Sequence, residues 1–133
     1  MKFYDFLVDT NARELENSSV MATFEQALND YFQNRETSFM NGLPSVKYFA
    51  DKCCLSSNYF GDLVKKETGK TPLEFIQQKI IGIAKEELHS SDVTITEVAY
   101  RLGFQSSQHF NRYFKRNTGM TPTEFRKRSR HSA

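Results

Sequence analysis

The chain has 133 residues, 38% of them hydrophobic and 26% charged, a length that allows one ordinary domain or a small domain with an extension. No run of about 18 apolar residues occurs, and the first residues lack a basic start before an apolar core, so neither a membrane span nor a secretory signal is expected. The formal net charge of +2 is uneven, because residues 1–43 carry three basic and seven acidic side chains, residues 44–92 seven of each, and residues 93–133 eight and two.

This excess of positive charge at the C-terminal end suggests an anionic partner, for which nucleic acid is the default candidate. The alternative is a solvated basic tail, because four of the eight cations lie near the end of the chain, at Arg126, Lys127, Arg128 and Arg130. Charge alone does not separate these two readings.

The first 43 residues are predicted to be an N-terminal extension and linker. Residues 1–19 are polar and weakly periodic, which favours an extended or partly disordered segment. Residues 20–34 carry apolar side chains at helical spacing and predict an amphipathic helix, which could pack on its own domain or dimerise. Residues 35–43 are expected to form a linker, with Asn41-Gly42 as a turn signal.

Residues 44–69 are predicted to form a first pair of short helices. Pro44 suits the first turn of the first helix, because proline lacks the backbone donor that this position leaves unused. Ser56 or Ser57 can cap the second helix, and Gly69 can end it.

A longer linker helix is expected over residues 71–89. Thr71-Pro72-Leu73-Glu74 combines a capping box with proline at the first helical position, which is a strong helix start. Apolar side chains occupy more than one face of this helix and predict that it packs on both sides: Leu73, Phe75, Ile76, Ile80, Ile81, Ile83, Ala84 and Leu88.

A second helix pair is predicted over residues 94–119, followed by a short last helix over 121–129. The signals are a capping box, a turn glycine, a serine cap and an ending glycine, at Thr94 to Glu97, Gly103, Ser107 and Gly119. No alternating strand pattern of useful length occurs, so the predicted fold class is all-α, with two helix-turn-helix subdomains joined by the long linker helix.

The two helix pairs are copies of one another. Residues 56–75 recur at 106–125 with ten identities, at Ser56/Ser106, Ser57/Ser107, Phe60/Phe110, Lys65/Lys115, Thr68/Thr118, Gly69/Gly119, Thr71/Thr121, Pro72/Pro122, Glu74/Glu124 and Phe75/Phe125. Two copies are too few for a solenoid and indicate one domain that holds a small helical unit twice.

In a DNA-binding helix-turn-helix the second helix enters the major groove, so its outer face must carry donors and positive charge. In the second copy Gln108, Asn111, Arg112 and Lys115 form one stripe opposite Phe110 and Phe114, and these residue types can read guanine or adenine. Ser107 and the free amides at the helix start can hold a phosphate, while His109 borders this surface as a packing or phosphate-contact residue. An ordinary solvated helix face is the competing reading.

The equivalent stripe of the first copy is Asn58, Gly61, Asp62 and Lys65. Gly61 reads no base, and Asp62 repels phosphates although it can accept a hydrogen bond from cytosine. Tyr59 could stack on a sugar or touch a thymine methyl group. Either a groove contact or a structural, phosphate-docking role remains open for this copy. The linker helix spans about 28 Å at 1.5 Å per residue, compared with about 34 Å for one DNA turn, so two recognition helices could reach successive grooves.

The second copy contains Ala99-x-x-x-Gly103-Phe104, Phe110-x-x-x-Phe114-Lys115, Gly119, Thr121-Pro122 and Phe125-Arg126. This order, with its duplication, resembles the signature of the AraC/XylS family of bacterial transcription regulators over about residues 42–130. The turn of the second copy is longer by one residue, since Ala50 to Ser57 is seven steps and Ala99 to Ser107 is eight. The resemblance implies seven helices, two helix-turn-helix motifs and a DNA-binding domain over residues 44–133.

By position, the resemblance implies base-reading roles for Asn58, Tyr59, Asp62, Ser107, Gln108, Asn111 and Arg112. The family often has a basic or long polar side chain where this chain has Gly61 and Asp62, so the first motif departs from the family pattern at these two positions. Most members also carry a separate effector-binding, often dimerising domain. The implied partners are double-stranded DNA, RNA polymerase and either a second copy or such a domain, in the cytoplasm at the nucleoid.

The leading hypothesis is therefore a sequence-specific DNA-binding transcription regulator. The alternative is an interaction protein that keeps the fold without specific DNA readout, as Gly61, Asp62 and the neutral charge of the first unit suggest. It would pair with a related regulator through residues 20–34 and its acidic N-terminal segment. An enzyme is not expected, because no nucleophile with a paired base, metal-ligand spacing or phosphate-loop glycine run occurs. No cofactor is expected either, and the adjacent Cys53 and Cys54 are too few for a four-ligand zinc site.

Overall fold

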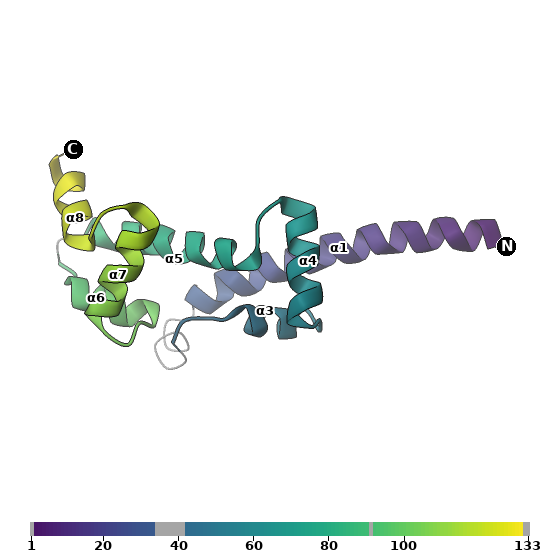
Figure 1. The fold of residues 1–133 in the computed structure, drawn as a ribbon, viewed down its shortest axis with the longest axis horizontal. Coiled ribbons are helices and arrows are strands. Elements are labelled where there is room, and N and C mark those ends of the chain that lie inside the picture. The colour runs from purple at the N-terminus through teal and green to yellow at the C-terminus, as the bar shows by residue number, and fades with distance from the viewer. Residues whose placement is uncertain (1, 34–41, 91, 132–133) are drawn as a thin grey trace. The chain divides into compact units, whose positions relative to one another are not determined.

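The computed structural model describes residues 2–33, 42–90 and 92–131, and within these ranges the chain forms seven helices and no strand (Figure 1). The all-α class predicted from the sequence is therefore confirmed. The chain divides into two compact units: Met1–Asp30 with Ser45–Pro72, and Tyr31–Pro44 with Leu73–Ala133. Among the described residues, no helix is both long and apolar enough to cross a membrane.

The first unit contains the first helix-turn-helix, formed by α3 (Val46–Lys52) and α4 (Ser57–Thr68). The hydroxyl of Ser45 caps α3, so Pro44 lies before the cap and not in the first helical turn that the sequence suggested. Ser56 accepts a hydrogen bond from the Tyr59 amide at 3.2 Å and caps α4. Gly69 ends α4 with a left-handed φ of 79°, as expected.

The N-terminal helix α1 (Lys2–Gln33) supplies a central part of this first core. The Phe24 ring is fully buried and meets the Phe49 and Phe60 rings edge-on, with centroid distances of 5.3 and 5.1 Å. Leu28 is also buried. The predicted amphipathic helix therefore completes its own domain, and the apolar surface that dimerisation would have needed is used internally.

The expectation of an extended segment over residues 1–19 is wrong for residues 2–19, which belong to α1. Helix propagation adds one hydrogen bond per residue once a nucleus exists, and Phe24 fixes that nucleus in the core. A segment with weak apolar periodicity can therefore remain helical by continuation. The linker predicted over residues 35–43 lies outside the described residues except for Gly42 and Leu43.

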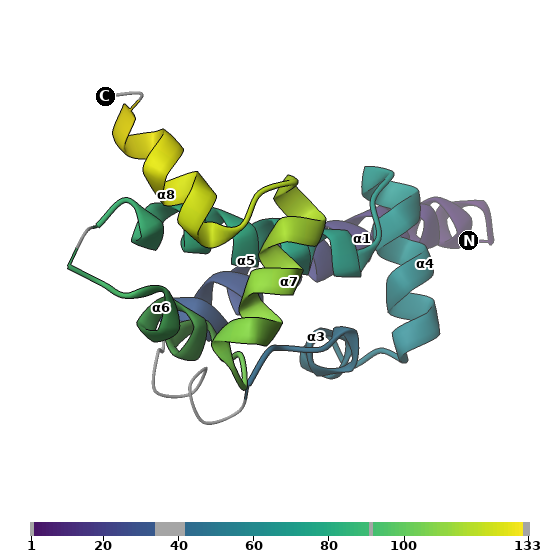
Figure 2. The same cartoon turned by 60° about the vertical axis from the view of Figure 1, so that its left-hand side comes forward.

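The second unit contains α6 (Ile95–Leu102), α7 (Ser107–Thr118), α8 (Pro122–His131) and the α5 residues that follow Pro72 (Figure 2). The Phe104, Phe110, Phe114 and Phe125 rings form a continuous chain of contacts, with successive centroids 5.2, 5.8 and 5.6 Å apart. Two of these rings, Phe110 and Phe125, belong to the identities of the internal repeat.

The helix starts of the second unit follow the predicted capping signals with one exception. Thr94 and Thr121 each accept a hydrogen bond from the amide three residues ahead, at 3.0 and 3.1 Å. Ser106 caps α7, whereas Ser107, the predicted cap, is the first residue inside the helix. Two adjacent serines satisfy the capping preference equally in sequence, so only the backbone geometry separates them.

The linker helix α5 (Pro72–Leu88) begins at the predicted proline. Five of its predicted apolar residues are buried: Ile76, Ile80, Ile81, Ala84 and Leu88. Leu73 departs from the prediction, because its side chain is 51% exposed.

The segment that precedes α3 lies against the turn between α6 and α7. The Tyr31 hydroxyl donates a hydrogen bond to the Gly42 carbonyl. A Cβ placed on Gly103 would lie 2.6 Å from the Gly42 carbonyl carbon, so the two backbones approach too closely for any side chain at that turn. Gly103 also has a left-handed φ of 99°, which gives glycine a second advantage there.

Candidate nucleic-acid interface

Helix α7 presents the polar stripe that the sequence predicted, held in place by its inner face. Phe110 and Phe114 are fully buried and orient the helix on the second core. On the opposite face Gln108, Arg112 and Lys115 are exposed. Within the described part of the chain their side chains have no hydrogen-bond or ion-pair partner, so their donors remain available to a ligand.

Asn111 occupies the edge of this stripe and is half-buried. Its side-chain carbonyl oxygen is shielded from solvent and has no hydrogen-bond partner in the structure. Bidentate recognition of adenine uses both the carbonyl oxygen and the amide nitrogen of asparagine. Asn111 would therefore have to turn its amide outward before it could read a base.

The start of α7 offers backbone donors. The Ser106 hydroxyl accepts the His109 amide at 3.1 Å, which leaves the amides of Ser107 and Gln108 without an intrahelical acceptor. Such amides at a helix N-terminus suit a phosphate. The His109 ring lies edge-on to Phe104 with centroids 5.4 Å apart. Packing was one of the two roles predicted for this histidine, and the structure shows this contact.

Arg116 extends the cationic face of α7 beyond the predicted stripe. Arg116 is exposed in the last turn of α7, one residue after Lys115 and one helical turn after Arg112. Continuing the helical period by one step would have found it. On the same helix, burial raises the pKa of Tyr113 to about 12, while the positive charge of Arg116 acts in the opposite direction.

Helix α4 presents a surface of a different character. Asn58, Asp62 and Lys65 are exposed as predicted, and the Tyr59 side chain is 58% exposed. A Cβ on Gly61 would meet no atom within 4 Å, so packing does not require glycine there. The α4 sequence carries Lys65 and Lys66 against two acids, whereas α7 carries three lysine and arginine cations and no acid.

The C-terminal cations divide into a structural arginine and exposed ones. Arg126 donates hydrogen bonds to the carbonyls of Leu88, Ser90 and Val93, at 2.9, 3.0 and 2.6 Å. It therefore holds α8 to the end of α5 and to the following loop. Lys127, Arg128 and Arg130 are exposed, and Arg128 also donates a hydrogen bond to the Met120 sulfur at 3.6 Å. Of these four cations, Arg126 is the one that the structure shows in a structural role.

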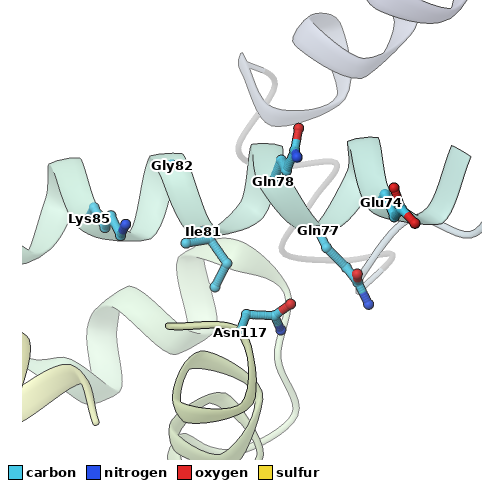
Figure 3. A pocket seen from close by; sticks show the side chains of 7 residues that line it. All are labelled: Glu74, Gln77, Gln78, Ile81, Gly82, Lys85 and Asn117. Atoms are coloured by element: carbon cyan, nitrogen blue, oxygen red, sulfur yellow. The ribbon is translucent and has the colours of Figure 1, made fainter. Parts of the chain in front are cut away.

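A polar groove of about 460 Å³ lies elsewhere, between one face of α5 and the end of α7 (Figure 3). Figure 3 shows Asn117 opposite Ile81 across this groove. Its remaining lining residues are Glu74, Gln77, Gln78, Gly82 and Lys85. None of the predicted base-reading residues lines it, so the hollow and the recognition faces are separate features.

Two helix-turn-helix units, one with a free cationic outer face, define a class of helical DNA-binding domain. Comparison with known proteins agrees, because the family described as a helix-turn-helix domain matches residues 49–128. The chain belongs to this family of AraC-type helix-turn-helix domains.

Individual relatives carry the same domain. The chain is 32% identical over 85 residues to the HTH-type transcriptional regulator AlkR of Acinetobacter baylyi, which covers 64% of this chain and 28% of AlkR. It is 35% identical over 77 residues to the HTH-type transcriptional activator RhaS of Citrobacter koseri, which covers 58% of this chain and 28% of RhaS. The chain thus spans little more than a quarter of the length of these curated relatives.

Among solved structures, the chain is similar to the DNA-binding domain of AdpA, a global transcriptional factor, in complex with a target DNA. The TM-score is 0.66 with 25% sequence identity, over 87% of this chain and 94% of that domain. This likeness places the helix order described above in a domain that has been seen on DNA.

Proposed function

We propose that this chain is a sequence-specific DNA-binding transcription regulator in which residues 44–133 form the DNA-binding domain and residues 1–43 the extension. The observation that carries the proposal is the outer face of α7, where Gln108, Arg112 and Lys115 are exposed and have no side-chain partner among the described residues. Arginine can bridge guanine O6 and N7, and glutamine can bridge adenine, from a helix in the major groove. The AdpA domain in complex with DNA and the regulator relatives support this assignment.

Both recognition helices are proposed to enter the major groove, with unequal contributions. Helix α7 carries cations without acids and supplies most of the phosphate attraction and base hydrogen bonding. Helix α4 carries as many acids as cations, so its net electrostatic attraction to phosphates is small. The second motif is therefore the main source of affinity, and the first motif adds selectivity through its few exposed side chains.

Selection of bound duplexes from a random pool, at two salt concentrations, tests this function. The expected result is an enriched sequence with two blocks about one helical turn apart, and binding that weakens steeply with salt. Enrichment of one block would show that only one helix reads bases. Salt-sensitive binding without enrichment would overturn sequence-specific recognition.

Replacing Arg112 by alanine tests the role of the α7 face directly. The loss should be about 1–3 kcal/mol on the selected duplex, with relaxed preference at one base pair. Lys127→Ala is the matched control, because it removes an exposed cation from α8 and should weaken binding equally on all duplexes. An equal loss for Arg112→Ala on selected and random duplexes would refute its base-reading role.

The further partners in this proposal are RNA polymerase and either a second copy of the chain or an effector-binding domain, at the nucleoid in the cytoplasm. The alternative is an interaction protein without specific DNA readout, which Gly61, Asp62 and the balanced charge of the first unit motivate. It would pair with a related regulator through the acidic N-terminal segment and through residues 20–34. Phe24, Leu28, Tyr31 and Phe32 of that segment are buried, which argues against pairing through it. Sedimentation of the chain with and without the selected duplex would decide between one copy and two.

A further inference from the structure

Tyr59 stands out on the surface of α4. It is the third residue of the helix and its side chain is 58% exposed, more than any other exposed large hydrophobic residue of the described chain. The amide of Tyr59 is used in the Ser56 cap. Its ring has no aromatic partner among the described residues, and its hydroxyl makes no hydrogen bond within them. The side chain therefore contributes nothing visible to the core.

The matching residue of the second motif behaves differently. His109 is also the third residue of its helix, but its ring lies against Phe104 with centroids 5.4 Å apart. An outward apolar ring at this position is thus a property of α4 alone. It lies in the N-terminal part of the helix, which is the part of a recognition helix that contacts base edges.

The chemistry of the major groove restricts what such a ring can read. The C5 methyl group of thymine is the apolar feature that this groove presents, and apolar side chains recognise it by contact. The net charge of α4 is balanced, so this helix lacks a strong electrostatic means of recognition. Contact between the methyl group and an otherwise solvated ring removes apolar surface of both from water, which stabilises the complex.

We propose that Tyr59 is a specificity-determining residue that selects a thymine by contact with its C5 methyl group. The inference rests on the proposed function and adds a named base feature to the first motif. It also gives α4 a way to discriminate between sequences without adding positive charge. Removal of one buried methyl group should weaken binding about four-fold.

The experiment uses the full chain and a duplex selected from a random pool, with each thymidine in turn replaced by deoxyuridine, which lacks only the methyl group. Affinities are measured for the wild type, Tyr59→Ala and Tyr59→Phe. Leu73→Ala is the matched control, because Leu73 is also an exposed large hydrophobic residue, on α5 and outside the recognition helices. Circular dichroism verifies that all variants are folded, as exposed side chains should allow.

One deoxyuridine duplex should bind about four-fold more weakly than its thymidine parent to the wild type, to Tyr59→Phe and to Leu73→Ala. Tyr59→Ala should bind that duplex and its parent with equal affinity. An unchanged deoxyuridine penalty in Tyr59→Ala would overturn the proposal. An equal, sequence-independent loss in both Tyr59 variants would also overturn it and identify the hydroxyl as a phosphate donor. A chain that selects no duplex from the pool would overturn the proposed function, which distinguishes that failure from failure of the Tyr59 assignment.

Discussion

Replacing Arg126 by alanine should destabilise the second unit. The guanidinium group donates three hydrogen bonds to backbone carbonyls, at Leu88, the last residue of α5, and at Ser90 and Val93 in the loop that follows. Carbonyls at a helix end and in a loop lack intrahelical donors, and a cation there also interacts favourably with the helix dipole. The planar, five-donor guanidinium group suits this arrangement, which a single lysine ammonium group cannot reproduce.

The size of the effect follows from these contacts. A hydrogen bond to a charged group contributes about 1.5–3 kcal/mol, but bonds from one side chain are not additive, and Arg126 is only half-buried. The expected loss is therefore about 2–4 kcal/mol for Arg126→Ala, and about 1–2 kcal/mol for Arg126→Lys, which can keep one bond. Lys127→Ala removes a neighbouring exposed cation and should change the unfolding free energy by less than about 0.5 kcal/mol.

Urea denaturation followed by circular dichroism measures this difference. The Arg126→Ala midpoint should fall by roughly 1–2 M, and the Lys127→Ala midpoint should stay near that of the wild type. If Arg126 belonged to a solvated basic tail, both variants would unfold like the wild type and would weaken DNA binding alike. Equal midpoints for the two variants would therefore refute the structural role.

Three further predictions follow from local geometry. Gly103→Ala should lower the unfolding free energy by about 2–4 kcal/mol in urea denaturation, because its Cβ would lie 2.6 Å from Gly42 and its φ is left-handed; wild-type stability would contradict this. Tyr113 keeps its proton in the folded state up to about pH 12, so its share of stability is complete below its ordinary pKa of 10.0 and is lost as pH rises through 12. Tyr113→Phe has no hydroxyl to ionise, so its unfolding free energy should fall less between pH 8 and 11 than that of the wild type. Identical losses in the two proteins would contradict the raised pKa of Tyr113. Alkylation at pH 8 should modify exposed Cys54 before Cys53, because burial and the adjacent Cys54 raise the pKa of the Cys53 thiol. Mass spectrometry of partly modified protein measures the order, and modification of Cys53 first would contradict the prediction.

The fold could be predicted because its local signals are duplicated. Glycines that end helices recur at Gly69 and Gly119, and both adopt the left-handed conformation that their position requires. The phenylalanines at equivalent positions, Phe60 and Phe110, are both fully buried. A signal that appears twice at the same spacing is independent evidence for the same element, so each copy confirmed the caps and the core positions of the other.

The details that could not be predicted depend on contacts between residues distant in sequence. Helical period places Asn111 on the outer stripe, but it does not reveal that the carbonyl oxygen of the side chain is shielded from solvent. Arg126 looked like one of several tail cations, because its acceptors lie 33 to 38 residues earlier in the chain. Residues 2–19 have weak periodicity of their own, and the core position of Phe24 is what anchors their helix.

The one-residue difference between the two turns has a structural explanation. The Leu55 amide bonds to the Ala50 carbonyl at 2.9 Å, and the Phe104 amide bonds to the Ala99 carbonyl at 3.0 Å, so the two turns correspond up to these residues. Ser56 then caps α4 at once, whereas Gln105 separates Phe104 from the cap of α7. Gln105 is therefore the additional residue of the second turn.

The same correspondence explains why the turns carry different residues at their left-handed position. Cys54 occupies this position in the first turn with a φ of 59°, at a conformational cost of about 1–2 kcal/mol. Gly103 occupies it in the second turn, where the backbone of Gly42 leaves no room for a Cβ. A side chain is thus tolerated where the turn is open and excluded where the segment before α3 lies against it. The backbone angle alone does not require glycine, because Cys54 adopts it in the first turn. Glycine is required in the second turn by the close contact with Gly42.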